Sequence, residues 1–275
     1  MTQQFMADST IIERYGFQAG SAFEDTFSAV SLESIWFSIV ATAIYILETL
    51  FDAFKEDVDA KISEAVVATI PWYHKIALAF QYGDELEYDE KTQGYIYPEI
   101  DTSKQIVKFA ACRDLGGLVY VLASKADANG RPTALSAAEL SAFDSYLRQC
   151  KPAGVLLQTD SFNPDQVRVS VTVQYNPQVI NSDGQLIADP SIYPVEDAIN
   201  AYLAGIVYGG ALNKTKLVDA IQAAGGVVDV VLSSVSVKPD NGSAYETVSG
   251  NNYNSVGGSF KSNNLRTGIS YVLSL

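Results

Sequence analysis

Apolar side chains recur with a helical period between residues 31 and 68, a stretch that contains neither Gly nor Pro. This pattern predicts one long helix. Within it, apolar residues follow one another at alternating steps of three and four. They are Phe37, Val40, Ile44, Leu47, Phe51, Phe54 and Val58, which we call the seam. A repeat averaging about 3.5 residues keeps one stripe against a partner helix along a left-handed supercoil. The seam therefore predicts a helix that packs against helices of other chains.

Two interpretations of the seam stay open. The stripe could pack inside its own subunit, as the apolar face of an amphipathic helix does in globular proteins. However, Trp36, Ile39, Ala43 and Leu50 widen the apolar surface beyond a single seam. A surface of that width favours contact with more than one neighbour.

A second helix and a linker are predicted after the long helix. A second helix is predicted from Pro71, which suits a first helical turn, to Gly83, which ends one. The acidic stretch that follows predicts a linker over residues 84–99.

The middle of the chain mixes strands and a helix. Two β-rich runs lie on either side of Gly116 and Gly117 and predict a hairpin. Ser136 and Glu139 have the spacing of a capping box, which starts a helix. Residues 154–159 return as a strand.

The last third opens with strict alternation of apolar and polar residues from Val167 to Tyr175, which predicts a strand with one buried face. Two helices follow, one from Pro194 and one over Lys214–Ala224, and then a strand over Val227–Val237 and a closing strand after Gly268. The polar residues 239–262 predict a long loop. Because long unstructured loops are uncommon inside compact domains, we expect this loop to become ordered against a neighbouring chain.

These elements predict an α+β protein, with long N-terminal helices of bundle or coiled-coil type followed by two small α+β domains. The predicted organisation is an N-terminal arm at 1–30, a helical bundle region at 31–83, an acidic linker at 84–99, a middle α+β domain at 100–163 and a C-terminal α+β domain at 164–275.

Charge narrows the choice of partners. The net charge is −14 and only 18% of the residues are charged. A chain this acidic repels phosphate backbones, so nucleic acid is excluded as a partner. The uncharged run from Ser34 to Leu47 is shorter than the ~20 residues that a bilayer needs, and acidic residues flank it. It predicts a helix without a membrane span.

Few residues of the sequence suggest a catalytic or metal site. Cys112 and Cys150 match no metal-ligand or redox spacing, and two isolated thiols fit synthesis in a reducing cytoplasm. His74 is the single histidine, which cannot supply a multi-histidine metal site. Glu24 and Asp25 are adjacent rather than alternating, so they do not form the carboxylate pair of a nucleotidyltransferase. We expect no cofactor and no metal.

One resemblance adds to this picture. The segment Val167–Val173, the helix ending in Ala201, Tyr202 and Leu203, and the run from Lys216 into Gly225-Gly226-Val227 together resemble the C-terminal region of the baseplate J-like family. Members of this family are wedge subunits of bacteriophage tails and related contractile injection systems. The similarity covers about 166–237, and the helical region from Ile35 to Asp59 also looks like members of the family.

The resemblance implies a structural role. The seam would be the face that joins a small helical bundle with neighbouring wedge proteins, and the domain from 164 onward would close a ring around the tail hub. It implies other wedge and hub proteins as partners, and a location in the virion tail baseplate after assembly in the bacterial cytoplasm. The function expected is thus a non-enzymatic baseplate wedge subunit. The alternative is an enzyme of the nucleotidyltransferase or hydrolase class with an unrecognised site.

Overall fold

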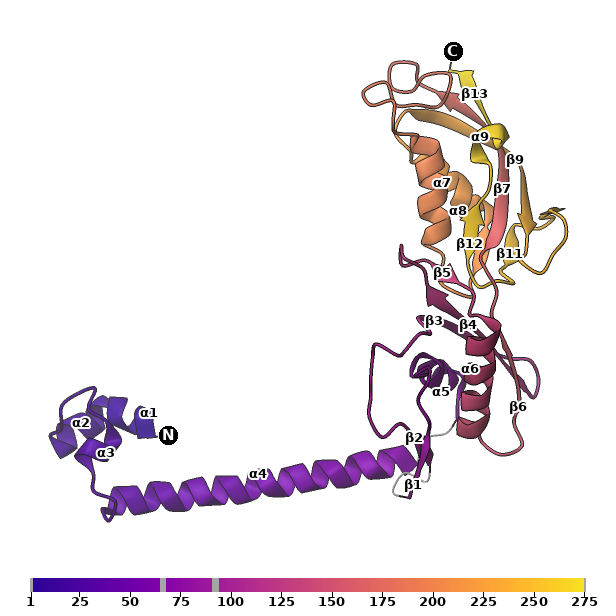
Figure 1. The fold of residues 1–275 in the computed structure, drawn as a ribbon. Helices are drawn as coiled ribbons and strands as arrows, with labels where there is room; N and C mark the ends of the chain where they lie inside the picture. Colours follow the sequence, from indigo (N-terminus) through magenta and orange to yellow (C-terminus); the bar gives the residue numbers. More distant parts are fainter. Residues whose placement is uncertain (1, 65–67, 91–93, 275) are drawn as a thin grey trace. The chain divides into compact units, whose positions relative to one another are not determined.

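The computed structural model describes residues 2–64, 68–90 and 94–274, and it combines helices with β-sheets (Figure 1). The chain divides into two compact units, Met1–Val66 and Val67–Leu275. The mixed α+β class is confirmed, and so is one long helix near the N-terminus, α4 (Leu32–Glu64). The sequence predicted more than one long N-terminal helix. In the described residues, the longest helix after α4 has 14 residues. The coiled-coil arrangement and the division into two small domains stay predictions.

The described part of the first unit contains helices and no strand. Its helices are α1 (Thr2–Ala7), α2 (Ser9–Tyr15), α3 (Phe23–Thr26) and α4. Asp8 caps α2, because its carboxylate accepts a hydrogen bond from the Thr10 N–H at 2.9 Å. Gly16 ends the same helix in the left-handed region, with φ of 72°. The described residues before α4 therefore contain three short helices.

Aromatic rings hold these short helices against the start of α4. The Phe5 ring lies 5.2 Å from the Phe37 ring and 6.2 Å from the Phe23 ring, in edge-to-face geometry. Phe23 also stacks on Phe27 at 4.9 Å. Such pairs contribute about 0.5–1.5 kcal/mol each beyond the burial of their area. The arm is thus a small aromatic cap on one end of the long helix.

The second unit contains two hydrophobic cores. The first core lies between helices and a mixed sheet. Its elements are α5 (Ile70–Leu78), α6 (Ala137–Cys150), β3 (Phe109–Asp114), β4 (Leu118–Ala126), β5 (Pro132–Thr133) and β6 (Leu156–Asp160). The β3–β4 hairpin turns at Gly116 and Gly117, both with positive φ. Ser136 and Glu139 form the predicted capping box, with both reciprocal hydrogen bonds present.

The stretch 84–99 differs from the predicted linker. It contains a two-stranded antiparallel hairpin, β1 (Glu87–Asp89) and β2 (Gly94–Ile96). The fully buried Gln81 holds the base of this hairpin. Its amide donates to the Glu99 carbonyl oxygen at 3.0 Å and accepts from the Asp101 N–H at 2.7 Å. An acidic composition predicted a solvated linker, whereas one buried amide ties the segment to the first core.

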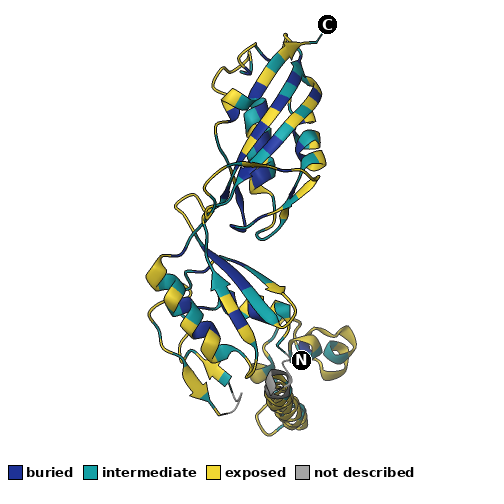
Figure 2. Ribbon diagram, turned by 90° about the vertical axis from the view of Figure 1, so that its right-hand side faces the viewer, coloured by how far each residue is buried: buried dark blue, intermediate teal, exposed yellow. Residues whose placement is uncertain are grey.

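The second core lies under a five-stranded sheet. The sheet is built on β7 (Asp165–Tyr175), which pairs antiparallel with β9 (Val227–Lys238) and parallel with β13 (Ile269–Leu273). The inward-facing valines of β7 are buried and alternate with more exposed residues, as the banding in Figure 2 shows. Two helices, α7 (Pro194–Ala204) and α8 (Lys214–Gln222), contribute buried side chains to this core. The predicted strand, both helices and the closing strand are present.

The predicted loop at 239–262 is wrong as a description of this segment. It contains β10 (Glu246–Thr247), β11 (Asn252–Asn254) and β12 (Phe260–Ser262), which pair with β9, with β8 (Ala211–Asn213) and with β7. The buried Asp165 side chain accepts hydrogen bonds from the Val256 and Gly257 N–H groups, at 2.8 and 3.0 Å. Long-range pairing within the chain orders the segment, so its length no longer argues for a neighbouring chain.

Candidate functional site

The apolar surface of α4 is the most unusual feature of the described residues. Seam residues in the middle of the helix are largely exposed, with Leu47 at 52%, Phe51 at 62% and Phe54 at 61%. The residues that widen the seam, Trp36 and Leu50 among them, are exposed as well. Burying one such side chain contributes about 1.5–3 kcal/mol. A continuous apolar strip of this kind marks an interaction surface.

The first residue of the seam has a different environment. Phe37 is half-buried, and its ring lies 5.2 Å from Phe5 and 5.2 Å from Phe23. Phe37 therefore contributes to the aromatic cap of its own unit. Val40 and Val58 are half-buried, and the seam residues between them are exposed. The surface offered to a partner thus runs mainly from Val40 to Phe54.

The length of α4 also bears on membranes. By length and composition alone, Leu32–Asp59 is apolar enough to cross a bilayer. The uncharged run from Ser34 to Leu47 is only part of this helix, which continues through Glu48 and Asp52. Length by itself therefore does not exclude a membrane span.

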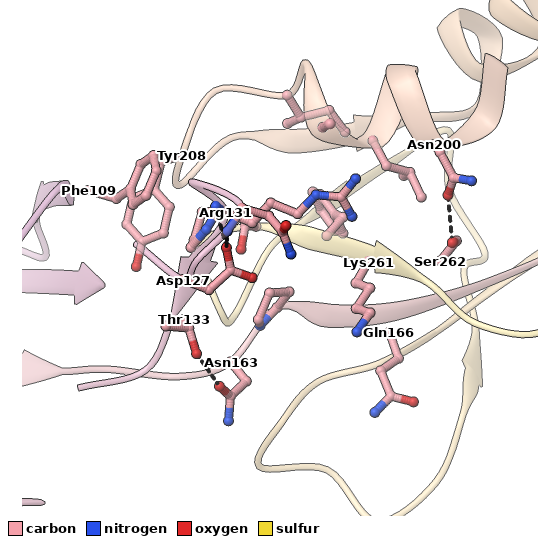
Figure 3. Close-up of a pocket in the computed structure, with 18 of the residues that line it drawn as sticks. Phe109, Asp127, Arg131, Thr133, Asn163, Gln166, Asn200, Tyr208, Lys261 and Ser262 are labelled. Carbon is pink, nitrogen blue, oxygen red and sulfur yellow. Dashed lines mark hydrogen bonds between the residues drawn. The ribbon is translucent and has the colours of Figure 1, made fainter. Parts of the chain in front are cut away.

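A pocket of about 830 Å³ lies in the second unit and is drawn in Figure 3. Polar side chains line much of it. Asn200 accepts a hydrogen bond from Ser262 at 2.6 Å, and Asn163 accepts one from Thr133 at 3.3 Å. The first bond joins α7 to β12, and the second joins β5 to the segment before β7.

Two acidic residues, Asp127 and Asp240, line this pocket, and Asp127 has a structural role. Asp127 accepts hydrogen bonds from the Arg131 and Asn129 N–H groups, each at 2.8 Å. These two bonds are the main reason that the pKa of Asp127 is lowered. A carboxylate kept ionised by its own turn is a poor general acid at neutral pH. Asp127 therefore does not have the environment of a general acid.

The candidate chemical residues lie on the surface of their own units. Glu24 and Asp25 lie exposed in the first turn of α3, and His74 lies exposed on α5. Among residues 2–64, 68–90 and 94–274, no group of three or more His, Cys, Asp or Glu could hold a metal ion.

The two thiols are half-buried and unpaired. Burial raises the pKa of Cys112 to about 12 and that of Cys150 to about 11. A thiol with so high a pKa carries little thiolate at neutral pH, and the thiolate is the reactive form. Neither cysteine has the environment of a catalytic nucleophile.

Sequence reasoning missed one exposed aromatic surface. Tyr88 and Tyr95 face each other across the β1–β2 hairpin, with ring centroids 5.7 Å apart, and are 56% and 47% exposed. Over 85–89, acidic residues alternate with Leu86 and Tyr88, a period that could have indicated a strand.

The chain was also compared with known proteins. No protein-family model matches it. No curated protein matches it either.

Proposed function

We propose that this chain is a structural subunit of a bacteriophage tail baseplate, a wedge protein of the baseplate J-like kind. It would assemble with copies of itself and with other wedge and hub proteins around the tail. The observation that carries the proposal is the exposed apolar strip of α4, from Ile44 to Phe54. A long helix with an uncovered apolar face gains free energy only when another surface covers it.

The spacing of the strip supports helices as that surface. A repeat of about 3.5 residues keeps one stripe against a neighbouring helix over several turns. A lipid surface imposes no such register on a helix, because acyl chains are fluid. The resemblance of residues 166–237 to the family supports the wedge role.

The C-terminal sheet supports a ring-forming role more weakly. Its strand β13 pairs with β7, and Val272 and Leu273 of β13 are 49% and 55% exposed. Exposed apolar residues on a strand that pairs on one side are typical of sites where another chain adds.

The proposal can be tested in assembled tails. Tail particles would be purified from cells that produce them and treated with a lysine-reactive cross-linker. We expect this chain in the particles, with cross-links from Lys55 of α4 to helices of other chains. Particles that lack this chain would contradict the baseplate role.

A second test uses a matched pair of variants. Leu47→Glu places a charge on the seam, whereas Tyr45→Glu places the same charge two residues away on the polar side of α4. We expect Leu47→Glu to prevent incorporation into particles and Tyr45→Glu to be incorporated normally. Normal incorporation of both would show that the seam is not an assembly surface.

A further inference from the structure

A second apolar stripe runs beside the seam on α4. It consists of Trp36, Ile39, Ala43, Ile46, Leu50 and Ala53, which follow one another at steps of three and four residues, as the seam does. Each member precedes a seam residue by one position. All six are exposed, Ile46 at 61% and Leu50 at 64% among them. The helix therefore carries two parallel stripes with the same repeat.

The angle between the two stripes determines how many partner helices are needed to cover them. Successive residues of an α-helix are rotated by about 100°, so the two stripes face directions about 100° apart. One partner helix cannot cover both stripes, because a two-helix contact uses a single seam. Each α4 therefore needs a neighbour on two sides.

Each stripe has an outer border, the side that faces away from the other stripe. The charges at these borders indicate which helix can pack beside α4. Beside the seam lie Glu48 and Lys55, and beside the second stripe lie Thr49 and Glu56. When copies of α4 lie parallel and level, with the seam of one on the second stripe of the next, Lys55 faces Glu56. Glu48 then faces the neutral Thr49. This arrangement creates an opposite-charge pair and no like-charge pair at these borders.

We propose that the partner of α4 is α4 itself, in a closed parallel bundle of three or more copies. The seam of each copy packs on the second stripe of the next copy. Such a contact joins two different surfaces, and it closes into a ring because level copies repeat the same rotation without a rise along the helix axis. This inference uses the same surface of α4 as the proposed function. It concerns self-association of the isolated chain, so it does not require the baseplate role.

Three consecutive residues make a matched test, because they lie on three different sides of α4. Tyr45 is 69% exposed on the polar side, Ile46 belongs to the second stripe and Leu47 to the seam. The full chain would be changed to Tyr45→Glu, Ile46→Glu or Leu47→Glu and measured by sedimentation equilibrium. Wild type and Tyr45→Glu are expected at three or more copies. Each of the other two is expected as a monomer, with self-association weakened about 100-fold or more.

Mixing two variants tests how the copies are joined. Ile46→Glu keeps an intact seam and Leu47→Glu keeps an intact second stripe, so an equimolar mixture can form one intact contact. We expect the mixture to form a heterodimer, although each variant alone is a monomer. If the seams instead packed on each other, Ile46→Glu alone would dimerise and mixing would add nothing, which would overturn the arrangement.

The remaining outcomes distinguish self-association of α4 from binding of lipid to the same face, and they distinguish it from the baseplate role. A monomeric or dimeric wild type would refute the closed bundle, and so would loss of association in Tyr45→Glu. A wild type that is monomeric in buffer and floats with phosphatidylcholine–phosphatidylglycerol vesicles would assign the face to lipid. A monomeric chain that is still present in tail particles would refute the closed bundle and would agree with the baseplate role. A self-associating chain that is absent from particles would do the opposite.

Discussion

Replacing Gly268 by Ala tests how the last strand of the C-terminal sheet is attached. Gly268 ends α9 (Leu265–Gly268) directly before β13. A Cβ at this position would lie far inside contact distance of the Val169 carbonyl oxygen, which belongs to the backbone of the central strand β7. A backbone atom in a sheet cannot move aside as the end of a flexible side chain can. The added methyl group must therefore push α9 and β13 away from β7.

The loss in the free energy of unfolding can be worked out from the displacement of β13. Overpacking a well-packed site costs about 1–3 kcal/mol. Displacement of β13 also exposes Ile269, which is 8% exposed in the native sheet, and a fully buried Ile contributes about 1.5–3 kcal/mol. Because the strand need not detach completely, we expect a loss of about 2–4 kcal/mol in the free energy of unfolding. This is a large part of the ~5–15 kcal/mol typical of a domain.

The control for this substitution is Gly225→Ala. A Cβ at Gly225 meets no atom within 4 Å, and its φ is not in the left-handed region. This change is expected to be neutral or to stabilise the protein by up to about 1 kcal/mol, through the unfolded chain. Urea unfolding followed by circular dichroism gives the free energies, and amide hydrogen exchange of residues 269–273 reports on β13 itself. Unchanged exchange and an unchanged urea midpoint in Gly268→Ala would refute the reasoning.

Three further predictions concern single groups. Burial raises the pKa of Asp165, so its contribution to stability is fully present below its ordinary pKa and is lost as pH rises through the raised value. The cost of Asp165→Asn relative to wild type should therefore grow in urea titrations as pH falls from 7 toward the ordinary pKa of an Asp, and a cost independent of pH would contradict this. Ser136→Ala removes the cap of α6 and should destabilise the protein by about 0.5–2 kcal/mol in the same titrations, whereas Ser145→Ala, within that helix, should not. Because burial raises the pKa of Cys112 and Cys150, both should react with a thiol reagent at pH 7 much more slowly than free cysteine, and denaturant should restore the rate.

Local patterns determined the elements whose signals lie close together in sequence. The step of three and four residues marked α4, because a helix brings such positions onto one side. The alternation from Val167 to Tyr175 marked β7, because successive side chains of a strand point to opposite faces. The capping box of α6 depends on two residues three positions apart, Ser136 and Glu139, so the sequence contained both partners.

Tertiary structure decided the features that depend on distant residues. The polar composition of 239–262 predicted a loop, but β10, β11 and β12 form because β9, β8 and β7 offer unpaired backbone groups to them. The acidic stretch 84–99 becomes a hairpin whose base is held by Gln81. The β8–β11 and β7–β12 pairings join segments far apart in the chain, so no short window contains both sides of them, and composition and period could not predict them.

The same difference holds for the candidate site. The sequence by itself determined which residues of α4 form an apolar stripe, because their spacing is a local property of one helix. Only the tertiary structure decided that Phe37 belongs to the aromatic cap of its own unit, because Phe5 and Phe23 reach it from other helices. It also decided that Leu47 to Phe54 lie uncovered in the described chain, since exposure depends on what the rest of the fold places beside a residue.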